Sequence, residues 1–288
     1  MTQPSALPPV FRHHPRRFGD WKYVYPVISR RAGGVSLGVN LNLDKVCNFD
    51  CVYCQVDRRE MGEREFLDLG RLDEELRQAV PWIVSGEIFR DPAFAQTPAD
   101  FRRFHDIAFS GDGEPTTYRN FPEVIAAAAA VRRELAPPEL KLVLITNASM
   151  FHRSAVQRGL ELLDANNGEI WAKLDAGTEA YFRRIARTAI SFGQILENIT
   201  EAARARPIVI QTLLMRWGDD PPDEAERAAY CRRLQELLAA GGRLRRVQLY
   251  TVARPPAESF ARPLSAAELE DWAEAVRRAV AVPVAVYP

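Results

Sequence analysis

The sequence predicts an α/β protein whose parallel sheet curls into an open, partial (β/α)6-type TIM barrel. From residue 106 onward, short apolar runs rich in β-branched residues alternate with longer segments of helical periodicity. Strands that alternate with helices at this rhythm indicate βαβ units, which place the strands parallel in one sheet. Six or seven such units can be counted, which is fewer than the eight of a closed barrel.

The first residues differ from the rest in composition, so we divide the chain into two parts. Residues 1–34 are expected to form an N-terminal arm and an edge strand, and residues 35–288 the barrel. Residues 1–20 are rich in Pro, Arg and His and predict an extended arm. Residues 21–29 alternate aromatic and β-branched residues around Pro26. Because proline cannot donate a ladder hydrogen bond, this strand is expected at a sheet edge.

The barrel begins with a strand over residues 35–43, which leads directly into a cysteine-containing loop. The first helix is expected over residues 72–84, with Asp73, Glu74 and Glu75 in its first turn. The helix dipole favours acidic side chains at that end.

The later elements alternate as the fold class requires. Residues 85–105 predict an irregular insertion with a short helix. The later strands are expected at residues 106–110, 141–146, 169–174, 207–215, 246–252 and 282–287. The later helices are expected at residues 121–135, 152–163, 178–185, 192–205, 223–240 and 265–280, the last starting with a capping box of Ser265 and Glu268.

Composition and charge indicate a soluble protein of ordinary type. Hydrophobic residues make up 47% and charged residues 26% of 288, and the formal net charge is zero, so no global field favours nucleic acid or an acidic membrane. The basic clusters at residues 12–17, 30–31 and 243–246 are expected to be solvated surface. Residues 1–9 lack the pattern of a signal peptide, and no run of about 18 apolar residues exists. We therefore expect a cytoplasmic protein that does not associate with a membrane.

Three of the four cysteines, Cys47, Cys51 and Cys54, lie at a C-x3-C-x2-C spacing within one short loop. Three thiolates can hold three irons of a 4Fe–4S cluster and leave the fourth iron open for a substrate or cofactor. A zinc site would need a distant fourth ligand, such as one of the four histidines. A disulfide would leave one thiol unpaired. The fourth cysteine, Cys231, is expected to be a buried structural thiol within a helix.

Polar residues follow the strands at the end where barrel enzymes gather their chemistry. Two glycines in the turn Gly111-Asp112-Gly113-Glu114 allow positive φ and the close approach of a ligand to the backbone. Tyr53 is a further candidate, because its ring could lie beside a ligand. Thr146 and Asn147 could bind a ribose or a carboxylate, or they could cap a helix. The remaining candidates are Gln211 with Thr212, and Arg254, which could bind an anion. Lys173 and Asp175 share one face of a strand, either as a structural ion pair or as ligands of a cofactor or substrate.

The cysteine loop after a first strand resembles that of the radical S-adenosylmethionine (SAM) superfamily. The Gly-rich turn is similar to the GGEP element of that family, with Asp112 in place of its first glycine. The resemblance implies that Cys47, Cys51 and Cys54 hold a 4Fe–4S cluster and that SAM binds its open iron. It further implies reductive cleavage of SAM to a 5′-deoxyadenosyl radical that abstracts hydrogen from a substrate, with electrons from a donor such as flavodoxin or ferredoxin.

Several segments together are similar to the wyosine-forming tRNA enzymes of this superfamily: residues 29–34, residues 36–41, the cysteine loop through Gln55, and residues 110–116, 173–176 and 248–256. The wyosine synthases carry a second cluster on additional N-terminal cysteines, whereas this chain has no cysteine before Cys47. The resemblance therefore implies a single-cluster relative with its own substrate, for which RNA is a candidate. Two alternatives stay open: an activating enzyme for a glycyl-radical protein, and a non-enzymatic iron–sulfur redox protein.

Overall fold

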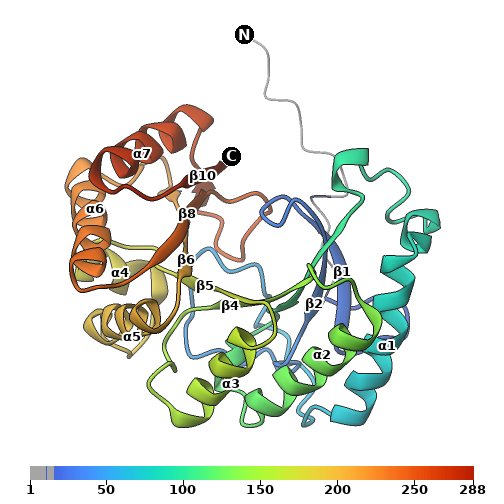
Figure 1. Cartoon of the computed structure of the whole chain (residues 1–288). Helices are drawn as coiled ribbons and strands as arrows, with labels where there is room; N and C mark the ends of the chain where they lie inside the picture. Colours follow the sequence, from blue (N-terminus) through green and yellow to red (C-terminus); the bar gives the residue numbers. More distant parts are fainter. Residues whose placement is uncertain (1–10, 12–15) are drawn as a thin grey trace.

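The computed structural model describes residue 11 and residues 16–288, so most of the predicted arm lies outside the described residues. One eight-stranded sheet, in the order β1-β2-β3-β4-β5-β6-β8-β10, curls around a central axis with β1 and β10 at its two edges (Figure 1). The strands are β1 (Val24–Ser29), β2 (Gly34–Val39), β3 (Phe104–Phe109), β4 (Lys141–Thr146), β5 (Gly168–Lys173), β6 (Ile208–Leu213), β8 (Leu244–Tyr250) and β10 (Val284–Tyr287).

The predicted fold class is confirmed, because every strand pair from β2 to β10 is parallel and the sheet does not close. Only β1 runs antiparallel, and it pairs with β2 from Val24 opposite Val39 to Ser29 opposite Gly34. Pro26 therefore lies in an edge strand, as its missing donor requires. Tyr287 Oη donates to the Arg31 carbonyl (3.4 Å), which links the last strand to the β1–β2 turn across the open side.

Helices pack around the outside of the curled sheet (Figure 1). The last helix starts with the predicted capping box of Ser265 and Glu268. The helices are α1 (Leu69–Val84), α2 (Phe121–Leu135), α3 (Ser154–Asp164), α4 (Glu179–Ala186), α5 (Phe192–Ala205), α6 (Glu224–Ala239) and α7 (Ala266–Ala279). The insertion after α1 holds the short 3-10 helices Glu87–Arg90 and Ala99–Phe101.

The expected position of the acidic residues in α1 is wrong. The helix starts earlier than predicted, because the Asp68 side chain accepts the backbone N–H groups of Gly70 and Arg71, and no acidic residue lies in the first turn. Glu75 is instead buried, and its carboxylate accepts the backbone N–H groups of Lys22 (2.8 Å) and Tyr23 (2.7 Å). It therefore ties α1 to the start of the edge strand.

Inside the barrel, four buried side chains form a small apolar layer: Ala108, Val143, Trp171 and Val209. The C-terminal ends of the strands lie beyond this layer and remain free to form a site. A second, two-stranded ribbon of β7 (Met215–Trp217) and β9 (Ala261–Pro263) lies outside the main sheet and was not predicted.

No helix in the part of the chain that the structure describes is long and apolar enough to span a membrane.

Candidate functional site

A cavity of about 290 Å³ opens at the C-terminal ends of the strands. The cysteine loop, the Gly-rich turn and the ends of β4, β5 and β8 line it together, so segments far apart in sequence meet there. Every predicted site residue except Asp175 and Thr212 lines this cavity: Cys47, Cys51, Tyr53, Cys54, Gly111, Asp112, Gly113, Glu114, Thr146, Asn147, Lys173, Gln211 and Arg254. Asp175 lines a smaller adjoining cavity of about 30 Å³ together with Cys51, Tyr53 and Lys173.

Backbone hydrogen bonds hold the cysteine loop against the C-terminal end of α4 and close a turn within the loop. The N–H of Val52 donates to the Ile185 carbonyl (2.9 Å), and the N–H of Cys54 donates to the Cys51 carbonyl (2.9 Å). Burial raises the pKa of Cys47, and burial together with the Asp175 carboxylate raises the pKa of Cys51 to about 12. These thiols therefore ionise only when a positive charge or a metal compensates for the loss of solvent.

The donor set fits an iron–sulfur cluster. Three thiols from one loop line one cavity, and soft thiolate ligands select this kind of cofactor. Cluster ligands bind separate irons and need not converge on one point. Among the residues that the structure describes, no three His, Cys, Asp or Glu side chains gather closely enough to hold a single metal ion.

Arg58 is a site residue that sequence reasoning missed. Its Nη1 lies 3.0 Å from Cys54 Sγ, its Nη2 donates to the Asp112 carbonyl (3.1 Å), and its Nε donates to the Lys45 carbonyl (3.1 Å). One guanidinium thus connects the cysteine loop to the Gly-rich turn and places a positive charge beside a thiol. Its position in an irregular loop, followed by a second arginine, gave no signal of this role.

The Gly-rich turn lies against the residues that follow β2. A Cβ atom on Gly111 would come 2.1 Å from Asn40 Oδ1, and one on Gly113 would come 2.2 Å from the Val46 carbonyl oxygen. Neither glycine has positive φ, so the close approach and not the backbone conformation explains them. Asp112 Oδ2 accepts Asn40 Nδ2 (2.6 Å), and Arg16 Nη1 lies 3.3 Å from Asp112 Oδ1.

Glu114 joins the ends of β3 and β4. Its buried carboxylate accepts the Thr116 backbone N–H (3.1 Å), the Thr146 hydroxyl (2.6 Å) and the Asn147 backbone N–H (2.7 Å), as well as the Thr116 hydroxyl. Burial raises the pKa of Glu114, and these hydrogen bonds act in the opposite direction. The side chain is therefore a structural brace, and the alternative that Thr146 and Asn147 cap a helix is wrong because Arg153 holds the N-cap position of α3.

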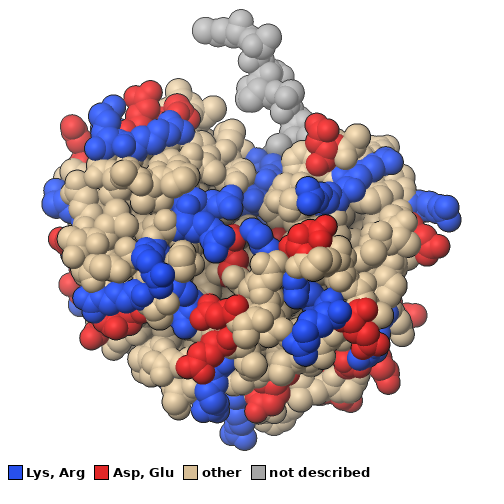
Figure 2. All heavy atoms as spheres, in the orientation of Figure 1, with Lys and Arg blue, Asp and Glu red and all other residues tan. Residues whose placement is uncertain are grey.

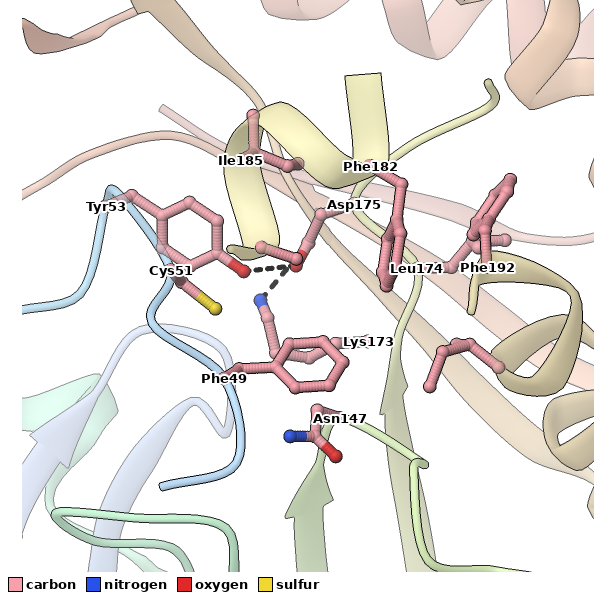
Figure 3. A pocket seen from close by; sticks show the side chains of 12 residues that line it. Phe49, Cys51, Tyr53, Asn147, Lys173, Leu174, Asp175, Phe182, Ile185 and Phe192 are labelled. Atoms are coloured by element: carbon pink, nitrogen blue, oxygen red, sulfur yellow. Dashed lines mark hydrogen bonds and ion pairs between the residues drawn. The ribbon is translucent and has the colours of Figure 1, made fainter. Parts of the chain in front are cut away.

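Lys173 and Asp175 form an ion pair with Nζ–Oδ1 of 3.2 Å, as one of the two sequence interpretations proposed. Tyr53 Oη donates to Asp175 Oδ2, and Figure 3 shows this hydrogen bond together with the ion pair. Lys173 Nζ also lies 2.7 Å from Tyr250 Oη. The ammonium also lies 5.1 Å from the ring centroid of Tyr53. Burial lowers the pKa of Lys173, but Asp175 and Tyr250 outweigh it and raise the pKa above its ordinary value. Lys173 is thus a firmly held cation beside the cysteine loop.

The remaining candidates divide into those at the cavity and those away from it. Gln211 lines the cavity, whereas Thr212 bonds the Leu174 carbonyl (2.9 Å) on the other face of β6. Arg16 and Arg31, from two of the basic clusters, also line the cavity. Cys231 lies on α6, away from the cavity, and is half-buried instead of buried.

No protein-family model matches the chain. A GTPase Obg of Brachyspira hyodysenteriae is 23% identical over 254 residues, which are 85% of this chain and 32% of that protein. A UPF0026 protein of Helicobacter pylori is 27% identical over 240 residues, which are 80% of this chain and 66% of that protein. The chain thus spans less than two thirds of the length of these relatives.

Two solved structures share the fold. A radical SAM methyltransferase from Sphaerobacter thermophilus superposes with a TM-score of 0.60 at 13% identity, covering 92% of this chain and 68% of that one. TYW1 with a lysine–pyruvate adduct bound superposes with a TM-score of 0.51 at 16% identity, covering 84% and 73%. The chain therefore shares the fold of these two structures, which is the fold that the resemblance implied.

Proposed function

We propose that this chain, which has the fold of radical SAM enzymes, is itself a radical SAM enzyme of the cytoplasm with a single 4Fe–4S cluster. One observation carries the proposal. The three cysteines and all the residues predicted to bind SAM except Asp175 come from five separate segments of the chain, yet they line one cavity at the carboxyl ends of parallel strands. Barrel enzymes place their active sites at this end.

Cys47, Cys51 and Cys54 would hold the cluster. When bound and reduced, it supplies the electron that cleaves SAM to methionine and a 5′-deoxyadenosyl radical, which removes a hydrogen atom from the substrate. The protein contributes the charges that make the site possible. Burial raises the pKa of both Cys47 and Cys51. Arg58 acts against it at Cys47, and Lys173 acts against it at Cys51, each with a smaller effect.

The SAM-binding groups are expected among the other residues that line the cavity. The Asp112 carbonyl already accepts Arg58, so the neighbouring carbonyls of Gly111 and Gly113 are the candidates to accept the SAM amino group. Lys173 is the candidate partner of the SAM carboxylate, because it is a fixed cation at the cavity wall. Asn147 and Tyr53 offer an amide and an aromatic face.

The TYW1 structure holds a lysine–pyruvate adduct, which raises the question of whether Lys173 acts as a nucleophile here. A nucleophilic lysine needs a lowered pKa at neutral pH. Lys173 Nζ instead lies 3.2 Å from Asp175 Oδ1 and 2.7 Å from Tyr250 Oη. These contacts outweigh burial and raise its pKa, because they stabilise its charged form. We therefore assign it to electrostatic binding. The substrate itself is open, RNA is a candidate, and a one-electron donor of the flavodoxin or ferredoxin type is expected.

Anaerobic reconstitution with iron and sulfide, followed by dithionite and SAM, tests the proposal. Chromatography should detect 5′-deoxyadenosine above a control without protein. The Cys47→Ala, Cys51→Ala and Cys54→Ala variants should each lose the cluster and the product, whereas Cys231→Ala should keep both. Cluster loss in Cys231→Ala alone would overturn the assignment of the site.

A further inference from the structure

A second, smaller cavity of about 70 Å³ lies beside the cysteine-lined cavity. The two share a wall that includes Arg31, Tyr53, Tyr250 and Arg254. The smaller one is also lined by residues of both edge strands, Ser29 of β1 and Tyr287 of β10. It therefore lies at the open side of the barrel, where a substrate can enter without crossing the sheet. Its volume is several times what one water molecule needs.

Three arginines, Arg30, Arg31 and Arg254, line this smaller cavity. The Arg31 guanidinium lies 4.5 Å from the centroid of the Tyr250 ring, which holds it in place. Arg30 Nη1 donates to the carbonyl of Pro288. Figure 2 shows Lys and Arg side chains gathered near the middle of the face viewed, below the residues drawn in grey.

Arg31 and Arg254 have no Asp or Glu partner. Within the described residues, no Asp or Glu side chain forms an ion pair with either of them, and the remaining residues, 1–10 and 12–15, contain no Asp or Glu. Burial and the neighbouring charges of Arg31, Arg16 and Arg30 lower the pKa of Arg254 to about 10. A chain with zero net charge thus places two guanidinium groups without an Asp or Glu ion-pair partner, and a third beside them, at one cavity. Such a concentration is costly unless a bound anion neutralises it.

We propose that this cavity binds the phosphate group of a phosphate-ester substrate, with Arg31 and Arg254 as its principal ligands and Arg30 as a supporting charge. A phosphate offers several oxygens to planar guanidinium groups and carries enough charge for more than one of them. The rest of the substrate then extends past Tyr250 into the cysteine-lined cavity. The inference rests on the proposed function for what happens there, but phosphate binding does not depend on it.

The test uses the full chain, reconstituted under anaerobic conditions, and inorganic phosphate as the probe. Isothermal titration calorimetry at low ionic strength should show one phosphate bound per chain. Arg31→Gln and Arg254→Gln should each weaken binding by about tenfold or more, as expected for the loss of a charged hydrogen bond. Arg232→Gln removes the same charge from an exposed position of α6 and should leave the affinity unchanged.

The same affinity in wild type, Arg31→Gln and Arg254→Gln would overturn the inference, as would displacement of phosphate by SAM. Ribose 5-phosphate and a short single-stranded RNA then distinguish a free phosphate ester from a nucleic-acid backbone. Displacement of phosphate by ribose 5-phosphate or by the RNA supports the inference. If neither displaces it, the bound phosphate is an adventitious ion only, and the inference is overturned. Formation of 5′-deoxyadenosine without phosphate is measured on the same preparation, so failure of the proposed function is recognised separately.

Discussion

Glu114→Gln is the most informative single substitution at the strand ends. The Glu114 carboxylate is 3% exposed and accepts four hydrogen bonds. A glutamine can keep the three bonds to one oxygen, but its amide nitrogen then faces the Asn147 backbone N–H, which loses the acceptor that glutamate Oε2 provides. A buried donor left without an acceptor costs about 1–3 kcal/mol, and loss of the charge weakens the remaining bonds.

We therefore expect Glu114→Gln to lower the free energy of unfolding by about 2–4 kcal/mol. In a domain of this size, each kcal/mol shifts Tm by about 2–4 °C, so Tm should fall by roughly 4–16 °C. The assay is thermal unfolding of the anaerobically reconstituted protein, followed by circular dichroism. Glu123→Gln is the matched control, because Glu123 is exposed on α2. A Tm for Glu114→Gln equal to that of the control would refute the bracing role.

Three further predictions follow from the same structure. Burial raises the pKa of Asp106 from its ordinary 3.8 to about 7. Near pH 6 the folded state therefore keeps a proton that the unfolded chain has lost. The free energy of unfolding should fall by about 1.4 kcal/mol as pH rises from 6 to 8 and this proton is released. Urea denaturation of Asp106→Asn should lack this contribution, and equal pH dependence in both proteins would contradict it. Gly113→Ala places a Cβ 2.2 Å from the Val46 carbonyl oxygen, so the iron content after reconstitution should drop sharply. Gly193→Ala is the control, because its Cβ has nothing within 4 Å, and it should bind iron like wild type. Equal iron content in both variants would argue against the close contact. Arg58→Gln removes the charge 3.0 Å from Cys54 Sγ, so its cluster should be lost to a chelator several-fold faster than that of wild type, and an unchanged rate would show that Arg58 does not support the thiolate.

Sequence patterns predicted the elements best where local signals agree with the tertiary structure. The bounds of α2, β4 and α5 match the expected residues, because an apolar stripe of clear period is bounded by a turn or a cap. The start of α1 was missed because Asp68 caps a first turn that carries little periodicity. The ribbon of β7 and β9 was missed because three-residue strands that pair across a long separation leave no periodic pattern.

The candidate site shows the same division. The cysteine spacing and the strand-end rule identified the residues that line the cavity. What the sequence could not show is how these residues use each other. Glu114 turned out to bind backbone and hydroxyl groups, and Lys173 is held by Tyr250 from a strand 77 residues away. Such pairings depend on the curl of the sheet and not on any local pattern.

The measurement that tests the central claim most directly is electron paramagnetic resonance of the dithionite-reduced, reconstituted protein with and without SAM. The claim is that Cys47, Cys51 and Cys54 hold a cluster with one open iron and that SAM binds it. SAM should then shift the signal of the reduced cluster in wild type and in Cys231→Ala alike. A fully loaded, reducible cluster whose signal does not respond to SAM would contradict the claim and favour a redox carrier.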